Sequence, residues 1–211
     1  MEAAVPSSVT AVLERSRELG FLGPQPIARQ IEHALDFWRA IVASGLGSSQ
    51  RILDLGSGGG LPGLVLLDRA SGASVALLDG SVRRCSFLDD SLAELAVGSR
   101  ARVLCGRAED LGRQDQLRSS FDLVVARSFG PPAVVAECAA PFLAPGGHLL
   151  VSEPPEGAVF ERWPEDGISK VGLGDARLVT EGSRFALLAQ VSECPDRYPR
   201  RTGIPTKRPL F

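Results

Sequence analysis

The sequence has no long apolar stretch, no paired cysteine motif and no leader-like start. Its longest apolar runs fall far short of the roughly 20 residues that span a bilayer, so we expect no membrane association. The first eight residues lack the basic start and apolar block of a secretory signal, which predicts a cytoplasmic protein. The four cysteines form no Cys-x-x-Cys pair and have no histidine at ligand spacing, so we expect reduced thiols and no metal.

Lysine is also scarce, because only Lys170 and Lys207 occur among 23 basic residues. Arginine therefore supplies most cations, and its planar fork suits phosphates and stacks on bases. The formal net charge of −2 hides an uneven distribution, since residues 197–211 hold five basic residues and no acid. The prolines of this basic tail predict an extended conformation. We expect phosphate contacts that depend on salt and not on base sequence, through Arg197, Arg200, Arg201, Lys207 and Arg208.

Short apolar segments alternate with helical patterns along most of the chain. This alternation predicts an α/β fold with a doubly wound, mostly parallel sheet. We expect strands near 52–55, 74–78, 102–105, 121–126 and 148–152, and a terminal β-hairpin from 169–179 and 184–191. Helices are expected at 8–19, 27–42, 61–68, 81–97, 131–143 and 157–163. We divide the chain into an N-terminal helical cap (1–47), a core (48–196) and the basic tail (197–211).

The stretch from Arg51 to Gly63 joins an apolar strand, an acid and five glycines, and predicts a strand, a tight turn and a helix start. Helix N–H groups that follow such a turn can donate to ligand oxygens. Within it, Gly58-x-Gly60-x-x-Gly63 fits the dinucleotide fingerprint, which leaves an NAD-binding oxidoreductase open. The frame Asp54-x-Gly56-x-Gly58-x-Gly60 instead resembles motif I of class I methyltransferases, which holds the amino-acid end of S-adenosylmethionine. Asp79 ends the next apolar run, where either fold binds a ribose hydroxyl.

Further motifs accompany this loop. They are His33-Ala-Leu-Asp36, Leu78-Asp79, Arg107-Ala-Glu109, Phe121-Asp122, Ala126-Arg-Ser-Phe129, Leu143-Ala-Pro-Gly-Gly147 and Tyr198-Pro-Arg-Arg-Thr-Gly-Ile-Pro-Thr-Lys-Arg-Pro209. As a set they resemble the glucose-inhibited division protein B family, over about residues 30–209. The resemblance implies a Rossmann-like class I methyltransferase that uses S-adenosylmethionine to methylate N7 of one guanine in 16S ribosomal RNA. Its partner would be ribosomal RNA or the small ribosomal subunit, and we expect a monomer.

The resemblance also implies a cofactor site, with Gly56 and Leu61 at the methionine end and Asp79 at the ribose. Ala108 and Glu109 would lie at the adenine, and Arg127 between cofactor and base. The full expected set is Asp54, Gly56, Ser57, Gly58, Gly60, Leu61, Asp79, Ala108, Glu109 and Arg127.

Methyl transfer to N7 asks for little side-chain chemistry. The sulfonium is a strong electrophile and N7 carries a bare lone pair, so we expect alignment and no general base. Arg127 and Arg107 are candidates for orienting the guanine or a phosphate through paired donors. His33, on the helix before the glycine loop, is a third candidate for substrate positioning.

Three segments depart from the family pattern. Residues 20–26 replace an Asn-Leu-Thr segment, and Ser57 stands where the family has threonine. Where a Lys-Gly is usual, this chain has Ser152-Glu-Pro-Pro-Glu156. Acids beside a cleft also suit a methyltransferase that acts on a small molecule or a protein, and that alternative stays open at this stage.

Overall fold

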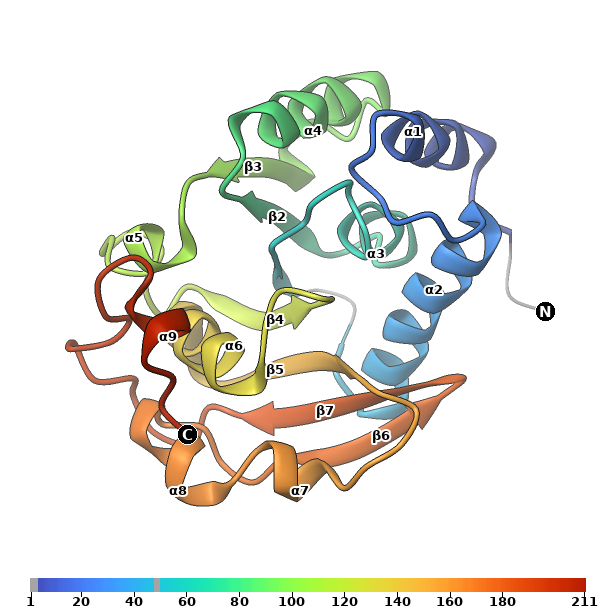
Figure 1. Cartoon of the computed structure of the whole chain (residues 1–211). Coiled ribbons are helices and arrows are strands. Elements are labelled where there is room, and N and C mark those ends of the chain that lie inside the picture. Colours follow the sequence, from blue (N-terminus) through green and yellow to red (C-terminus); the bar gives the residue numbers. More distant parts are fainter. Residues whose placement is uncertain (1–3, 48–49) are drawn as a thin grey trace.

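The computed structural model describes residues 4–47 and 50–211, which form a seven-stranded sheet with helices on both faces (Figure 1). The strand order is β3-β2-β1-β4-β5-β7-β6. Strands β1 to β5 run parallel, whereas β7 pairs antiparallel with β5, and β6 pairs antiparallel with β7. The doubly wound sheet and the terminal hairpin predicted from the sequence are both confirmed. The strands are β1 (Arg51–Leu55), β2 (Ser74–Asp79), β3 (Ala101–Cys105), β4 (Phe121–Ala126), β5 (Leu143–Glu153), β6 (Arg177–Glu181) and β7 (Ser183–Ala189).

The helices alternate with the strands as the sequence predicted, and short helical turns add to them. The α-helices of the described chain are α1 (Ser7–Glu18), α2 (Ile27–Ala43), α3 (Gly63–Arg69), α4 (Val82–Glu94), α5 (Ala108–Leu111), α6 (Pro132–Ala139), α7 (Val159–Arg162), α8 (Glu165–Ile168) and α9 (Ile204–Lys207). Turns of 3-10 helix follow at Gly98–Arg100, Ala140–Phe142 and Ser169–Val171. Within these described residues, no helix is both long and apolar enough to cross a membrane.

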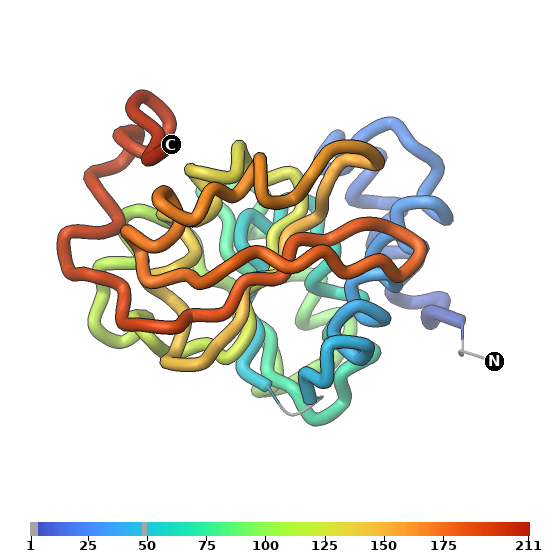
Figure 2. The backbone as a smooth tube through the Cα atoms, turned by 90° about the horizontal axis from the view of Figure 1, so that it is seen from below, coloured from blue at the N-terminus to red at the C-terminus, as the bar shows by residue number. Residues whose placement is uncertain are grey.

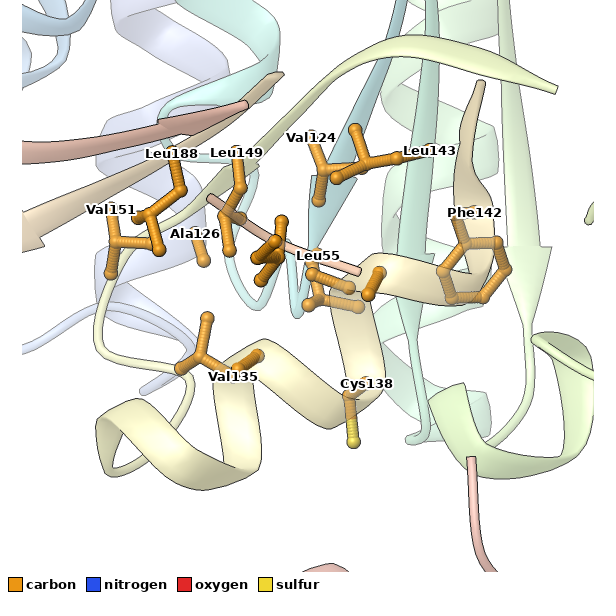
Figure 3. Packing of buried hydrophobic residues seen from close by; sticks show 14 of the residues in the cluster. Leu55, Val124, Ala126, Val135, Cys138, Phe142, Leu143, Leu149, Val151 and Leu188 are labelled. Carbon is orange, nitrogen blue, oxygen red and sulfur yellow. The ribbon is translucent and has the colours of Figure 1, made fainter. Parts of the chain in front are cut away.

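Side chains of alternate residues in the central strands pack into two separate apolar cores, one on each face of the sheet. Ile52 of β1 packs with α1 to α4 on one face, whereas Leu53 and Leu55 pack with α6 on the other. Figure 3 shows the second core, where Val135 of α6 faces the sheet side chains. Because both faces are covered, β1 and β4 are apolar along most of their length, as buried parallel strands require.

Several predicted boundaries move in the structure. The predicted helix 131–143 ends as α-helix at Ala139, and the predicted turn at 145–147 lies inside β5. There the pairing shifts register, since Phe121 pairs with Leu143 but Leu123 pairs with His148. The predicted hairpin start at residue 169 is wrong, because residues 169–171 form 3-10 helix and β6 begins at Arg177.

The N-terminal and C-terminal segments lie on opposite sides of the molecule (Figure 2). Helices α1 and α2 cover the sheet near the glycine loop, and the C-terminal segment with α9 packs beside α6 (Figure 1). Residues 1–3 of the expected helical cap, and residues 48–49 at its boundary with the expected core, lie outside the described residues.

Candidate functional site

The glycine loop leaves the carboxyl end of β1 and is fastened to the neighbouring strand. The backbone N–H groups of Gly56 and Ser57 both donate to the Leu78 carbonyl at 2.8 Å. Gly56 has a φ of +77°, and a Cβ there would lie 2.5 Å from the Phe129 ring. Backbone angle and space therefore both demand glycine at position 56.

A cavity of about 380 Å³ opens beside this loop, and we call it the Asp79 cavity. Its lining residues are Gly56, Leu78, Asp79, Gly80, Ser81, Arg84, Arg107, Ala108, Glu109, Ser128, Phe129, Val134, Cys138 and Thr206. The Asp79 carboxylate accepts from Gly58 N–H at 2.9 Å and from Ser81 N–H at 2.8 Å. Each oxygen keeps further acceptor capacity, because a carboxylate oxygen has two lone pairs. The carboxylate is thus held rigidly in the cavity wall and can still accept from sugar hydroxyls.

The glycine loop also borders a smaller cavity of about 210 Å³, the Gly58 cavity. It is lined by Phe21, Leu22, Gly23, Gln30, Gly56, Ser57, Gly58, Gly59, Leu61, Arg84, Arg127 and Ser128. Gly56 belongs to both cavities, so the two adjoin at the loop. The Ser16 hydroxyl of α1 donates to the Gly59 carbonyl at 2.9 Å and ties the first helix to the loop.

A third cavity, of about 800 Å³, lies beyond the carboxyl ends of β4 and β5, and we call it the His33 cavity. Its walls are Gln25, Arg29, Gln30, His33, Arg127, Ser128, Phe129, Gly130, Pro132, Val151, Ser152, Glu153, Pro154, Pro155, Arg162 and Trp163. Arg127 borders both this cavity and the Gly58 cavity. Its Nη2 donates to Gln30 Oε1 at 3.2 Å, and its buried Nη1 has no hydrogen-bond partner in the described part of the chain.

The three cavities meet at Ser128, which lines all of them. Its φ of +55° is unusual for a residue other than glycine, and such strain concentrates at functional sites. Phe129 follows it and lines both the Asp79 cavity and the His33 cavity. The turn after β4 therefore joins the space beside the glycine loop to the larger cavity.

Asp54 does not reach these cavities, although we expected it to contact the cofactor. Its side chain is fully buried, and Oδ2 accepts from the Gly63 N–H at 2.9 Å at the start of α3. Burial raises the pKa of the Asp54 carboxyl to about 7. Asp54 therefore braces the helix that follows the loop. Gly63 likewise serves packing, since a Cβ there would clash with Leu77 and Asp54.

Ala108 and Glu109 begin α5 and line the Asp79 cavity. The Glu109 carboxylate is buried, accepts from Gly203 N–H at 3.0 Å, and lies 3.6 Å from Arg107 Nη2. Arg107 itself is largely exposed at the cavity mouth. Glu109 therefore links the cavity wall to the C-terminal segment.

His33 lies in the wall of the His33 cavity, between Arg127 and two phenylalanine rings. Its ring centroid lies 5.5 Å from that of Phe37 and 6.0 Å from that of Phe185. Burial, together with the positive charge of Arg127, lowers the pKa of His33. The imidazole is therefore neutral near neutral pH.

The acidic segment after β5 carries less free charge than its sequence suggests. The Glu153 side chain is buried, and its carboxylate accepts from Arg162 Nε at 2.6 Å and from Trp163 Nε1 at 2.8 Å. Glu153 lines the His33 cavity, but its charge is balanced there by Arg162, which lines the same cavity. Glu156 is exposed to solvent outside the lining of that cavity.

The basic tail is not the extended segment that the prolines predicted. Ile204–Lys207 form α9, and Arg200 pairs with the fully buried carboxylate of Glu137 on α6. Arg200 donates to it from N and Nε at 2.8 Å and from Nη2 at 2.6 Å. The expected phosphate contact by Arg200 is therefore corrected, since its guanidinium anchors the tail. Arg197, Arg201, Lys207 and Arg208 remain exposed.

Sequence reasoning missed several residues that line the cavities. These are Gln30, Arg84, Ser128, Arg162 and Thr206. Gln30 had a usable signal, because it lies one helical turn before His33. The others come from segments that only the fold brings together.

The donor set fits S-adenosylmethionine. The fixed carboxylate of Asp79 lies beside Gly56, a position whose backbone angle and space only glycine allows. The Asp79 cavity and the adjoining Gly58 cavity provide separate spaces for the nucleoside and the amino-acid end. The volume of the Asp79 cavity lies in the range of about 300–1,000 Å³ that is usual for ligand sites.

Comparisons with known proteins show which family the chain belongs to. The family model GidB, described as rRNA small subunit methyltransferase G, matches residues 9–153. A relative named Ribosomal RNA small subunit methyltransferase G from Symbiobacterium thermophilum is 32% identical over 98% of this chain and 92% of its own length. One of the same name from Moorella thermoacetica is 33% identical over 85% of this chain and 77% of its own length.

Solved structures support the fold. An O-methyltransferase from Bacillus cereus in complex with SAH aligns with a TM-score of 0.61 at 17% identity, covering 88% of this chain and 91% of that one. A SAM-dependent methyltransferase from Aquifex aeolicus aligns with a TM-score of 0.58 at 16% identity, covering 84% and 97%. The fold is that of the class I methyltransferases, and the chain belongs to the rRNA small subunit methyltransferase G family.

Proposed function

We propose that this chain transfers the methyl group of S-adenosylmethionine to N7 of a guanine in small-subunit ribosomal RNA. Family membership supports the reaction and the class of substrate. The observation that supports the proposal is the junction at Ser128, which lines the cofactor-sized space, the Gly58 cavity and the His33 cavity.

Bound S-adenosylmethionine would supply an electrophilic methyl group at this junction. Asp79 would accept from the ribose hydroxyls, and the Gly58 cavity would take the amino-acid end. Ala108 and Glu109 would border the adenine. This placement puts the reactive centre near Gly56 and Ser128, which both cavities of the cofactor share.

The His33 cavity would take the target base. Enzymes that modify a base bring it out of its stack into such a pocket. Phe129 offers an aromatic ring in its wall, and the unpartnered Arg127 Nη1 offers a donor to the guanine edge or an adjoining phosphate. Arg29 adds an exposed cation at the rim.

No group needs to remove a proton, because N7 attacks through its own lone pair. We infer that His33 positions the substrate and is not a base. A neutral imidazole suits a site in which the methylated guanine becomes cationic, since it adds no like charge. Alignment of N7 with the methyl group would supply the rate enhancement.

The exposed cations of the tail would bind RNA phosphates outside the cavities. We assign this role to Arg197, Arg201, Lys207 and Arg208, and we withdraw Arg200 from the set. We further propose that the protein acts as a cytoplasmic monomer, with the small ribosomal subunit or its RNA as partner.

The two alternatives lose their support. The acidic segment that suited a small-molecule or protein substrate is neutralised at Glu153 by Arg162. The dinucleotide frame loses its support because the chain belongs to a methyltransferase family.

The test is incubation of the purified chain with methyl-labelled S-adenosylmethionine and either naked 16S ribosomal RNA or small subunits. Nucleosides from the product are then separated. Label in 7-methylguanosine is expected, and a lower yield from Asp79→Ala at limiting S-adenosylmethionine serves as the control. Label in another nucleoside, or none in RNA with either substrate, would contradict the proposal.

A further inference from the structure

The C-terminal tail contributes a residue to the wall of the Asp79 cavity. Thr206 of α9 lines this cavity together with Ala108 of α5 and with Val134 and Cys138 of α6. Ala108 and Thr206 are about a hundred positions apart in the sequence, and the fold alone brings them to one wall. No cofactor contact was expected from this segment.

Several polar contacts fix the position of this part of the tail. Arg200 is anchored on the buried Glu137, and the Thr202 hydroxyl donates to Asp110 Oδ1 at 2.7 Å. The turn into α9 is made by Gly203, whose φ is +79° and whose N–H donates to Glu109 Oε1 at 3.0 Å. Glu109 itself lines the cavity. The polypeptide before Thr206 is therefore tied to α5 and α6 through Arg200, Thr202 and Gly203.

The two threonines of the tail differ in what their hydroxyl groups do. The Thr202 hydroxyl is used by Asp110 and lies outside the cavity lining. Thr206 is exposed at the cavity edge, and its hydroxyl has no hydrogen-bond partner among residues 4–47 and 50–211. A threonine hydroxyl can both donate and accept, which matches the alternating donors and acceptors on the edge of a purine base.

We propose that Thr206 is a cofactor-binding residue, with its hydroxyl on the edge of the adenine and its side chain closing the nucleoside end of the cavity. The inference rests on the proposed cofactor role of the Asp79 cavity. The apolar side chains of Val134 and Ala108 would pack against the adenine ring, while Thr206 would supply the polar contact at its edge. The basic tail would then have an inner side that binds the cofactor and an outer side that carries its exposed cations.

The experiment compares Thr206→Val with Thr202→Val in the full chain. Both changes keep the side-chain shape and remove one hydroxyl, so thermal melting should show two folded proteins. Calorimetric titration uses S-adenosylhomocysteine and 5′-methylthioadenosine, which shares the nucleoside and lacks the amino-acid end. Thr206→Val should weaken both ligands by the same factor, about three- to tenfold, as expected for one lost hydrogen bond. Thr202→Val should bind both ligands like the parent, because the contacts of Arg200 and Gly203 still hold the segment in place.

Parental affinity in Thr206→Val would overturn the role of Thr206. A loss confined to S-adenosylhomocysteine would also overturn it, because the contact would then not be at the nucleoside. Failure of the parent itself to bind S-adenosylhomocysteine would remove the cofactor assignment of the cavity, which is a separate result.

Discussion

Replacing Arg200 with alanine should destabilise the fold, whereas the same change at Arg201 should not. Arg200 holds the Glu137 carboxylate with two guanidinium hydrogen bonds, and Glu137 is fully buried. The pairing raises the pKa of Arg200, so the guanidinium stays charged at any working pH. Alanine would leave the carboxylate buried with only a backbone N–H as donor.

Breaking a buried ion pair by removing one partner costs about 3–5 kcal/mol. That is a large part of the roughly 5–15 kcal/mol that stabilises a typical protein. For a chain of this size each kcal/mol shifts the melting temperature by about 2–4 °C, which gives a loss of about 6–20 °C. Arg201 is exposed, so its truncation should change stability by no more than about 0.5 kcal/mol.

Urea unfolding and calorimetric melting of the two variants measure this difference. The double variant Arg200→Ala with Glu137→Gln should recover part of the loss, because no charge then remains buried without a partner. RNA affinity should show the opposite order, with the folded Arg201→Ala protein weakened. A melting temperature for Arg200→Ala within about 2 °C of that for Arg201→Ala would refute the assignment of Arg200 as the anchor.

Three further outcomes are expected. Asp79→Ala should weaken S-adenosylhomocysteine binding more than about tenfold by calorimetry, because a carboxylate that accepts from two ribose hydroxyls is lost. An affinity equal to that of the parent would show that the ribose does not bind at Asp79. The pKa of Asp54 is raised to about 7 in the folded protein, so between about pH 4 and 7 the folded state binds a proton that the unfolded state has released. The contribution of Asp54 to the free energy of unfolding should therefore fall as pH rises through this range, by at most about 1.4 kcal/mol per pH unit. Asp54→Asn should remove that slope in urea unfolding, and equal slopes would contradict the argument. Joint replacement of Arg201, Lys207 and Arg208 by alanine should reduce the slope of log RNA affinity against log salt concentration by about two. An unchanged slope would show that these tail residues do not contact RNA phosphates.

Local patterns were sufficient to predict most of the sheet. The run at 121–126 is apolar because both faces of β4 are covered, and the glycines of the loop are required by positive φ and close contact. Such constraints act within a few residues and are visible in a single sequence. The position of Asp79 at the end of β2 follows from the same logic, because strand ends meet at one edge of a parallel sheet.

The direction of a side chain, and ion pairs between residues far apart in the sequence, could not be predicted from local patterns. Motif spacing placed Asp54 in the cofactor loop, but whether its carboxylate points to the ligand or into α3 depends on packing. In the sequence, Glu153 places a negative charge beside a cleft expected to bind RNA, and only the fold shows that Arg162 pairs with it. Likewise, Arg200 and Glu137 are separated by 63 positions, so a basic cluster in the sequence gave no sign that one member is structural.

The most direct measurement is a crystal structure of the chain with S-adenosylhomocysteine. The account predicts ribose hydroxyls on Asp79, the amino-acid end in the Gly58 cavity and the sulfur near Gly56 and Ser128, with the His33 cavity left to the base. Density for the ligand in the His33 cavity, or a ribose without contact to Asp79, would contradict it.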